Sequence, residues 1–353
     1  MKELQYLASW LRMIVAPVLG HSAQSLQIKY GLTTLRGVSL EGKKLKRANL
    51  EGQDIAGANL ASTDLTGANL RGANMHDAYL NNAKLAHADM TDAYLAGAAL
   101  EDINLNGAKL VNTNMSSALL NGAILKNISP YSLNLFGTTL QSAVFENVDM
   151  MEANLRFADL TSSCFINVKI TKTDISDAYI ENATFDNAIL SEVAMEYSDL
   201  FRAHFENIKL YKVRLANANL LGTHFEGASM AETDLANTNC VDANFKHAEL
   251  KNTIFSNADL FKADFSHALL QGANLRTTNL ESASFQYAAL ENADFTNANL
   301  RGALFDKADV TNVVFEDADL QDARLETAFN ITRAQLEVAK NAENIQLTED
   351  VDT

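Results

Sequence analysis

The chain has 353 residues, a formal net charge of −16 at pH 7 and only two cysteines. The acidic balance disfavours direct binding to nucleic acid, because an anionic protein is repelled by phosphate. Two cysteines provide no disulfide framework, and no run of 18 uncharged apolar residues occurs. We therefore expect neither a disulfide-stabilised secreted domain nor a membrane-spanning helix.

Residues 1–30 are predicted to form an amphipathic helix and cap. Apolar residues from Leu4 to Val18 recur at helical spacing, and Pro17 marks the expected end of the helix. A lid over the open core of the following repeat is the first interpretation. Docking on a membrane surface through Trp10 and Arg12 is the alternative. A signal peptide is disfavoured, because Glu3 and Arg12 interrupt the charge pattern that such a segment has.

Basic residues are concentrated near the start of the chain, where the segment from Met1 to Leu60 holds eight basic and four acidic side chains. The densest group either solvates an irregular first coil or contacts anionic lipid or an acidic partner. Gln53 and one residue of this group, Lys43, fall at positions that should face inward. The group consists of Lys43, Lys44, Lys46 and Arg47.

A five-residue repeat governs the middle of the chain. Every fifth residue from Leu35 to Leu325 is apolar, with Pro130 as the one exception. A period of five matches neither the helical period of 3.6 nor the strand period of 2, so the chain must turn a corner every five residues. We expect the apolar centre and the small residue two positions earlier, most often Ala, to point inward.

Phenylalanine and glycine reveal the larger geometry. A Phe stands at every fourth apolar centre from Phe145 to Phe305, so residues four repeats apart are expected to stack in a column. Fourteen of the 16 glycines fall two residues after an apolar centre. Because glycine tolerates a positive φ, this position is the predicted corner.

Segments such as Ala48-Asn49-Leu50-Glu51-Gly52 and Ala158-Asp159-Leu160 carry a family resemblance. They resemble the Ala-(Asp/Asn)-Leu-x-x consensus of the pentapeptide repeat family. The resemblance implies an all-β solenoid, a right-handed quadrilateral parallel β-helix of about 15 coils with short helical caps at both ends. The expected division is a cap at 1–30, a continuous β-helix at 31–328, and a capping helix with a frayed tail at 329–353.

The C-terminal segment is predicted to hold a short helix, with Asn330 or Thr332 as its N-cap and apolar residues from Ala334 to Ala339. A terminal helix is found in many proteins that this chain resembles. It would either close the solenoid or pair two copies into a homodimer, and both possibilities stay open.

No enzyme activity and no cofactor is expected. The stretch from Gly37 to Lys43 reads G-x-x-x-x-G-K, but Lys44 stands where a phosphate loop needs Ser or Thr. Histidine pairs one coil apart occur at outward positions, and two ligands are too few for a metal site. The pairs are His204 with His224 and His247 with His267.

Two outward columns are the candidate partner-binding surfaces. One is an apolar stripe directly after the apolar centres, and an exposed stripe of this kind is typical of a protein contact. The other is an acidic ladder. The stripe comprises Phe201, Leu221, Val241 and Phe261, and the ladder includes Glu146, Asp186, Glu206 and Glu226.

Three functions are compatible with these features. The first is a cytoplasmic bacterial rod that binds a protein partner along its side faces without catalysis. The second, implied by the gyrase-protecting branch of the family, is a mimic of duplex DNA that modulates a topoisomerase. The third is an effector delivered into a host cell without a signal peptide, with its N-terminal end on a membrane.

Overall fold

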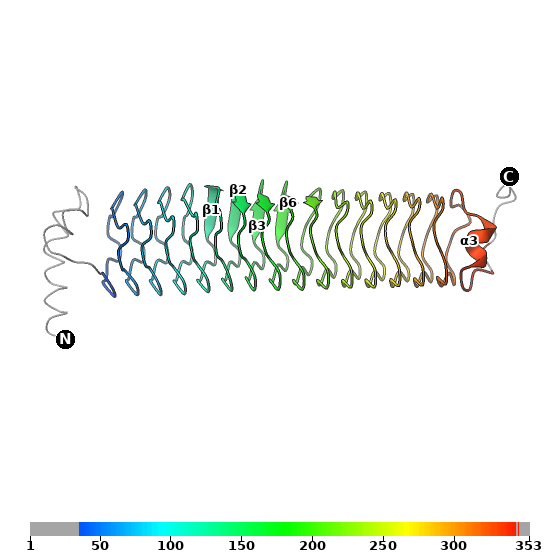
Figure 1. Cartoon of the computed structure of the whole chain (residues 1–353), viewed down its shortest axis with the longest axis horizontal. Coiled ribbons are helices and arrows are strands. Elements are labelled where there is room, and N and C mark those ends of the chain that lie inside the picture. Colours follow the sequence, from blue (N-terminus) through cyan, green and yellow to red (C-terminus); the bar gives the residue numbers. More distant parts are fainter. Residues whose placement is uncertain (1–34, 344, 346–353) are drawn as a thin grey trace. The chain divides into compact units, whose positions relative to one another are not determined.

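Stacked coils, each of four five-residue steps, make up the described part of the chain apart from its C-terminal end (Figure 1). The computed structural model describes residues 35–343 and 345. They divide into two compact units, unit 1 up to Leu160 and unit 2 from Thr161, which we describe separately. The predicted N-terminal helix and cap, with Trp10 and Arg12, and most of the predicted frayed tail lie outside the described residues.

Each five-residue step ends in a tight corner, as at Gly67. This residue has a φ of 67°, and the turn around it is closed by a hydrogen bond from the amide of Ala68 to the carbonyl of Leu65, at 2.9 Å. A positive φ at the third residue of a turn explains why Gly and Asn are frequent at this position. The predicted corner position is confirmed.

Unit 1 contains parallel coils in which each residue lies opposite the one four steps later. Four successive steps each form a bridge to the next coil: Asn49 to Asn69, Asp54 to Asn74, Asn59 to Tyr79, and Asp64 to Lys84. The longest strands, β1 (Ile124–Ile128) and β2 (Val144–Met151), pair in parallel with Ile124 opposite Val144. Four bridged sides in each coil define a parallel β-solenoid.

Unit 2 has the same construction. Its strands are β3 (Cys164–Ile166), β4 (Lys169–Thr171), β5 (Thr184–Asp186), β6 (Ile189–Ser191) and β7 (Lys209–Tyr211). Strand β3 pairs with β5, β4 with β6, and β6 with β7, always in parallel and with the same register of one full coil.

The core of unit 2 is a column of aromatic rings. From Phe165 to Phe305 the rings on successive coils stack with centroids 4.4 to 5.2 Å apart. Phe255, from the opposite side, meets the ring of Phe245 edge-on at 5.6 Å. Each aromatic pair contributes about 0.5–1.5 kcal/mol beyond burial of its surface. The predicted internal Phe column is confirmed within this unit.

Small inward positions are also filled as expected, including those that carry hydroxyl groups. Thr223 is fully buried, and its hydroxyl donates to the carbonyl of Leu200 in the preceding coil at 3.1 Å. Thr63 does the same to Leu40 at 2.9 Å. A buried hydroxyl is tolerated here because the preceding coil supplies an acceptor.

The expectation of inward side chains is wrong at Lys43, which is exposed although Gln53 in the next repeat but one is buried. Charge explains the difference, because an ammonium group inside the narrow core would lose its hydration without gaining a partner. Pro130, the exception in the apolar series, is nevertheless buried at its inward position.

The C-terminal segment contains the helix α3 (Arg333–Glu337), with Thr332 as its N-cap. Thr332 and Gln335 form a reciprocal capping box. The side-chain amide of Gln335 also donates to the carbonyls of Val310 and Val313, at 2.9 and 3.0 Å. The chain after α3 continues this contact, since Lys340 bridges Asp319.

Candidate protein-binding face

The four residues of the apolar stripe stand one above another in unit 2. The amide of Arg202 donates to the carbonyl of Leu221 at 3.0 Å, and the amide of Gly222 to that of Val241 at 2.9 Å. The amide of Asp242 bonds Phe261 in the same way at 2.9 Å. We call Phe201, Leu221, Val241 and Phe261 the apolar column.

The apolar column is half-buried and has charged ends. All four side chains have intermediate exposure, because each is partly covered by its neighbours in the stack. The same position is occupied by Glu181 in the coil before Phe201 and by Glu281 in the coil after Phe261. The apolar surface is therefore limited to four consecutive coils.

Two cations cover the aromatic ends of the column. The guanidinium of Arg202 lies 4.9 Å from the ring centroid of Phe201, and the ammonium of Lys262 lies 4.9 Å from that of Phe261. Such cation–π contacts contribute about 0.5–1 kcal/mol at exposed sites. We did not expect these cations from the sequence, although each directly follows its Phe at the corner.

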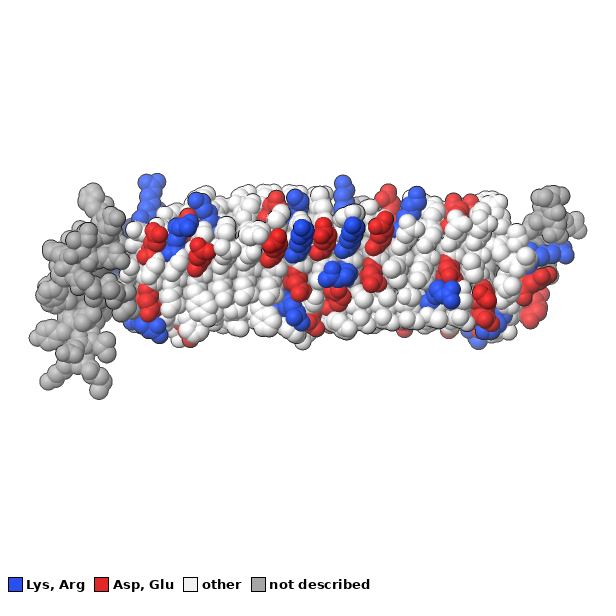
Figure 2. Space-filling view, viewed as in Figure 1, with Lys and Arg blue, Asp and Glu red and all other residues white. Residues whose placement is uncertain are grey.

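Several carboxylates of the acidic ladder have hydrogen-bond or ion-pair partners. In unit 2, Asp186 is exposed, whereas Glu206 accepts a hydrogen bond from Nδ1 of His204 at 2.9 Å. Glu226 accepts one from the side-chain amide of Asn244. In unit 1, Glu146 pairs with Lys126 at 2.6 Å. On the face shown in Figure 2, acidic and basic side chains are interspersed.

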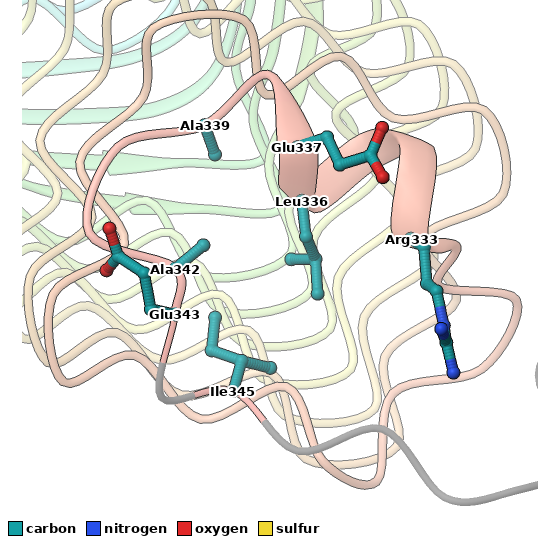
Figure 3. Close-up of a pocket in the computed structure, with 7 residues that line it drawn as sticks. All are labelled: Arg333, Leu336, Glu337, Ala339, Ala342, Glu343 and Ile345. Atoms are coloured by element: carbon teal, nitrogen blue, oxygen red, sulfur yellow. The ribbon is translucent and has the colours of Figure 1, made fainter.

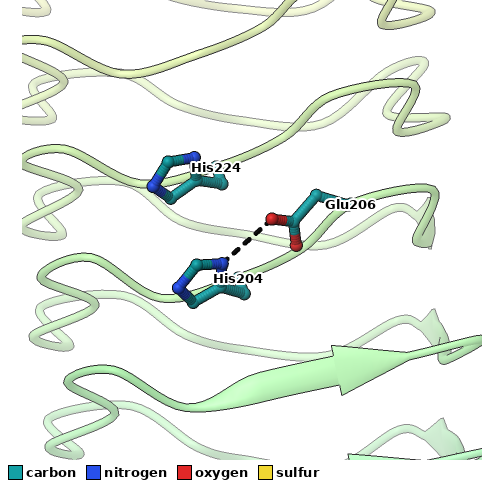
Figure 4. A group of neighbouring side chains, drawn as sticks. All are labelled: His204, Glu206 and His224. Carbon is teal, nitrogen blue, oxygen red and sulfur yellow. Dashed lines mark hydrogen bonds and ion pairs between the residues drawn. The ribbon is translucent and has the colours of Figure 1, made fainter.

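The structure brings three possible metal ligands together on unit 2. His204 and Glu206 lie on one coil, His224 lies on the next, and their ligand atoms are all within 4.8 Å of one another (Figure 4). Glu206 was missed as a third ligand, because only the histidine pairs were considered from the sequence. The signal was available, because residues two apart on an extended segment share a face.

The basic group near the start of unit 1 is solvated. Lys43, Lys44, Lys46 and Arg47 are all exposed. Lys46 pairs with Asp64 at 3.4 Å, so part of this charge is compensated.

Unit 1 also has exposed aromatic side chains that were not predicted as a site. Phe136 and Phe157 meet edge-on with centroids 5.4 Å apart, and Arg156 lies 5.1 Å from the Phe157 ring. Both rings are more than a third exposed. The sequence signal is weak, because Phe157 stands at a corner where polar residues and Gly are usual.

A pocket of about 460 Å³ lies beside α3 (Figure 3). Leu336, Ala339, Ala342 and Ile345 provide its apolar lining, and Arg333, Glu337 and Glu343 provide charges. No histidine is among the described residues that line this pocket. The alternative of a homodimer through this helix stays a prediction.

Among the residues that the structure describes, no helix has the length and hydropathy needed to cross a bilayer.

The fold and its outward columns define a parallel β-solenoid built from five-residue repeats. A family profile described as "Pentapeptide repeats (8 copies)" matches residues 33–72, 73–108, 88–127, 134–167, 258–297 and 293–329, and one described as "Pentapeptide repeat region" matches 198–275. The first covers more than half of the chain, which therefore belongs to the pentapeptide repeat family. Members of this family are generally structural or interaction proteins without catalysis.

Comparison with solved structures finds similar chains. HetL from Nostoc sp. strain PCC 7120, involved in regulation of heterocyst differentiation, is 19% identical over 91% of this chain and 97% of its own, with a TM-score of 0.24. A pentapeptide repeat protein of the Arabidopsis thaliana thylakoid lumen is 26% identical over 36% and 88%, with a TM-score of 0.29. QnrB1, a plasmid-mediated fluoroquinolone resistance protein, is 14% identical over 63% and 94%, with a TM-score of 0.21. Comparison with curated proteins finds no significant match.

Proposed function

We propose that this protein is a non-catalytic scaffold that binds a protein partner along the face of unit 2 that carries the apolar column. The observation that carries the proposal is four apolar side chains on consecutive coils, with Glu181 and Glu281 at the same position beyond each end. Both cysteines are free thiols, which is compatible with action in the reducing cytoplasm.

The chemistry of this surface favours a protein as the ligand. Aromatic residues and arginine are enriched where protein interfaces gain most of their binding free energy. Phe201 with Arg202 places both kinds of group at one end of the column, and Phe261 places an aromatic ring at the other, beside Lys262. A partner with an apolar strip would bury the column, and carboxylates beside that strip would pair with the two cations.

The test is affinity capture with the full chain and with a Phe201→Ser, Phe261→Ser variant. We expect partners captured by the wild type to be lost by the variant. The variant should still unfold cooperatively, with a melting temperature only a few degrees lower, because it loses two half-buried rings and their cation–π contacts but keeps the core. Tyr197→Ser is the matched control, since Tyr197 is an exposed aromatic residue outside the column. Capture of the same proteins by all three chains would refute the proposal.

A second candidate function is the modulation of a topoisomerase by mimicry of DNA. Its support is the row of Asp186, Glu206 and Glu226 on consecutive coils of unit 2. An acidic mimic should inhibit or protect gyrase in a supercoiling assay, and high salt should weaken the effect. Glu206→Lys with Glu226→Lys should reduce it, and an effect unchanged by this double reversal would exclude the idea.

A further inference from the structure

We propose that His204, Glu206 and His224 form a binding site for a divalent transition metal, with Zn²⁺ as the favoured ion. The site lies within unit 2 and goes beyond the proposed protein-binding function. It joins two adjacent coils, since His204 and His224 occupy the same position of successive coils and form a backbone bridge.

The geometry is close to that of a metal centre. The imidazole rings are parallel within 2°, with centroids 4.7 Å apart, and Glu206 approaches His204 to 2.9 Å. Ligand atoms around tetrahedral zinc lie about 3.3 Å apart, given bonds of about 2.0–2.1 Å. The observed span of 4.8 Å therefore has to shorten by about 1.5 Å, which three side chains can share. All three are half-buried, so their outer ends are free to rotate.

The donor set decides the class of ion. Two imidazole nitrogens and one carboxylate suit Zn²⁺, Cu²⁺ or Ni²⁺ better than Mg²⁺ or Ca²⁺, which prefer oxygen ligands alone. Because these side chains face solvent on one side, the remaining coordination positions would be filled by water or by a ligand from outside the chain.

A neighbouring carboxylate gives independent support. Glu226 Oε2 is buried and has no hydrogen-bond partner among the described residues, while Oε1 lies 3.5 Å from Nδ1 of His224. A buried carboxylate oxygen without a partner is costly, and a cation beside it would lower that cost. Glu226 would then orient His224 or supply a further ligand, as carboxylates beside metal-bound histidines do.

The surrounding charges do not supply that cation. One coil after Glu226, the same position of the repeat holds Lys246, whose ammonium pairs with Asp264 at 3.0 Å. On the other side of Glu206 the ladder continues with the exposed Asp186. The local field therefore favours a divalent cation.

The chain contains its own matched control. His247 and His267 also stack one coil apart, with centroids 4.8 Å apart and rings within 16°. No carboxylate completes a three-ligand group with them in the described part of the chain. Metal binding by this pair therefore shows the contribution of two stacked histidines without a third ligand.

The experiment titrates Zn²⁺ into the untagged full chain against a chromophoric chelator. We expect saturable binding of one ion per chain, weakened roughly tenfold or more by His204→Ala, His224→Ala or Glu206→Gln, and unchanged by His247→Ala or His267→Ala. At a fixed Zn²⁺ concentration the melting temperature of the wild type should rise more than that of Glu206→Gln, whose side chain keeps the same shape.

Two results would overturn the proposal. One is the absence of saturable Zn²⁺ binding by the wild type. The other is an equal loss of affinity in the His204 and His247 variants, which would show that exposed histidines bind the ion without a built site. Circular dichroism of each variant distinguishes loss of a ligand from loss of the fold.

Discussion

Corner residues adopt a left-handed backbone whatever their side chain. Phe157 has a φ of 57° and Tyr197 a φ of 61°, although bulky residues at such angles cost roughly 1–2 kcal/mol. The repeat compensates through its backbone, since the amide of Tyr197 bonds the carbonyl of Ala216 in the next coil at 3.3 Å. The backbone conformation of a corner therefore does not by itself decide which side chain stands there.

The two thiols should differ sharply in reactivity. Cys240 is fully buried, and burial raises the pKa of its thiol to about 12, despite a hydrogen bond with Thr238 that acts in the opposite direction. Cys164 is only half-buried. We expect a thiol reagent at pH 8 to modify one cysteine per native chain, because the thiolate is the reactive form and Cys240 stays protonated.

A colorimetric thiol assay counts the reactive cysteines per chain with and without denaturant, and so checks this expectation. Cys164→Ser should leave almost no reactive thiol in the native protein, and Cys240→Ser should leave the native count unchanged. Rapid modification of Cys240 in the folded chain would contradict the burial of this position.

Among the elements, α3 contacts the last coils through the side chain of Gln335. Gln335 completes the capping box and donates to the carbonyls of Val310 and Val313. Solenoid coils at an end have no neighbour to accept or donate their backbone hydrogen bonds, so a terminal element that does so is stabilising.

Replacing Gln335 should therefore loosen this end of unit 2. We expect Gln335→Ala to cost about 1 kcal/mol and to speed amide exchange around Val313. Gln335→Glu is the matched comparison, because it keeps the acceptor for the Thr332 amide but removes the donor to the two carbonyls. Equal exchange in all three proteins would show that the contact does not hold the coils.

Considered over the whole molecule, aspartates at the same step of the repeat accept hydrogen bonds from the residue two positions later. Burial alone would raise the pKa of Asp89, Asp294 and Asp309. Hydroxyl and backbone hydrogen bonds from Thr91, Thr296 and Thr311 act together with contacts from Lys109, Arg276 and Asn330, respectively. Combined, they outweigh burial and leave each pKa below its usual value. Hydrogen bonding to the charged form is the physical cause.

This arrangement predicts a stabilising term that disappears in acid. A carboxylate whose pKa is lowered by folding contributes its full stabilisation above the unfolded pKa of about 3.9, and loses it as the pH falls through the lower, folded pKa. The triple variant Thr91→Val, Thr296→Val, Thr311→Val should melt a few degrees below the wild type at pH 7. The difference should shrink below pH 4.

Calorimetry of both proteins from pH 7 to pH 3 measures that difference. Comparing variant with wild type removes the effect of the many other carboxylates, which titrate alike in both. A gap in melting temperature that stays constant or widens in acid would show that these hydrogen bonds do not favour the charged carboxylates.

The candidate site shows which contacts the periodicity of the sequence can predict and which it cannot. A repeat of four five-residue steps is enough to place Phe201, Leu221, Val241 and Phe261 in one column from the sequence alone. It does not reveal that Arg202 and Lys262 turn back over the rings, because corner side chains have several rotamers and neighbouring charges select among them. The ligand group of His204, Glu206 and His224 was missed for a related reason, since it mixes two positions of the repeat across two coils.

Sequence alone determined the five-residue step, the corner position, the inward Phe column and the family, because a repeat that never shifts allows one way to bury its apolar centres. Lys43 shows where that reasoning ends, since hydration of its ammonium group outweighs its inward position in the repeat. Only the tertiary structure decided which outward side chains meet. Neighbouring coils are only a strand spacing apart, so their contacts depend on rotamers and charges that the periodicity leaves undetermined.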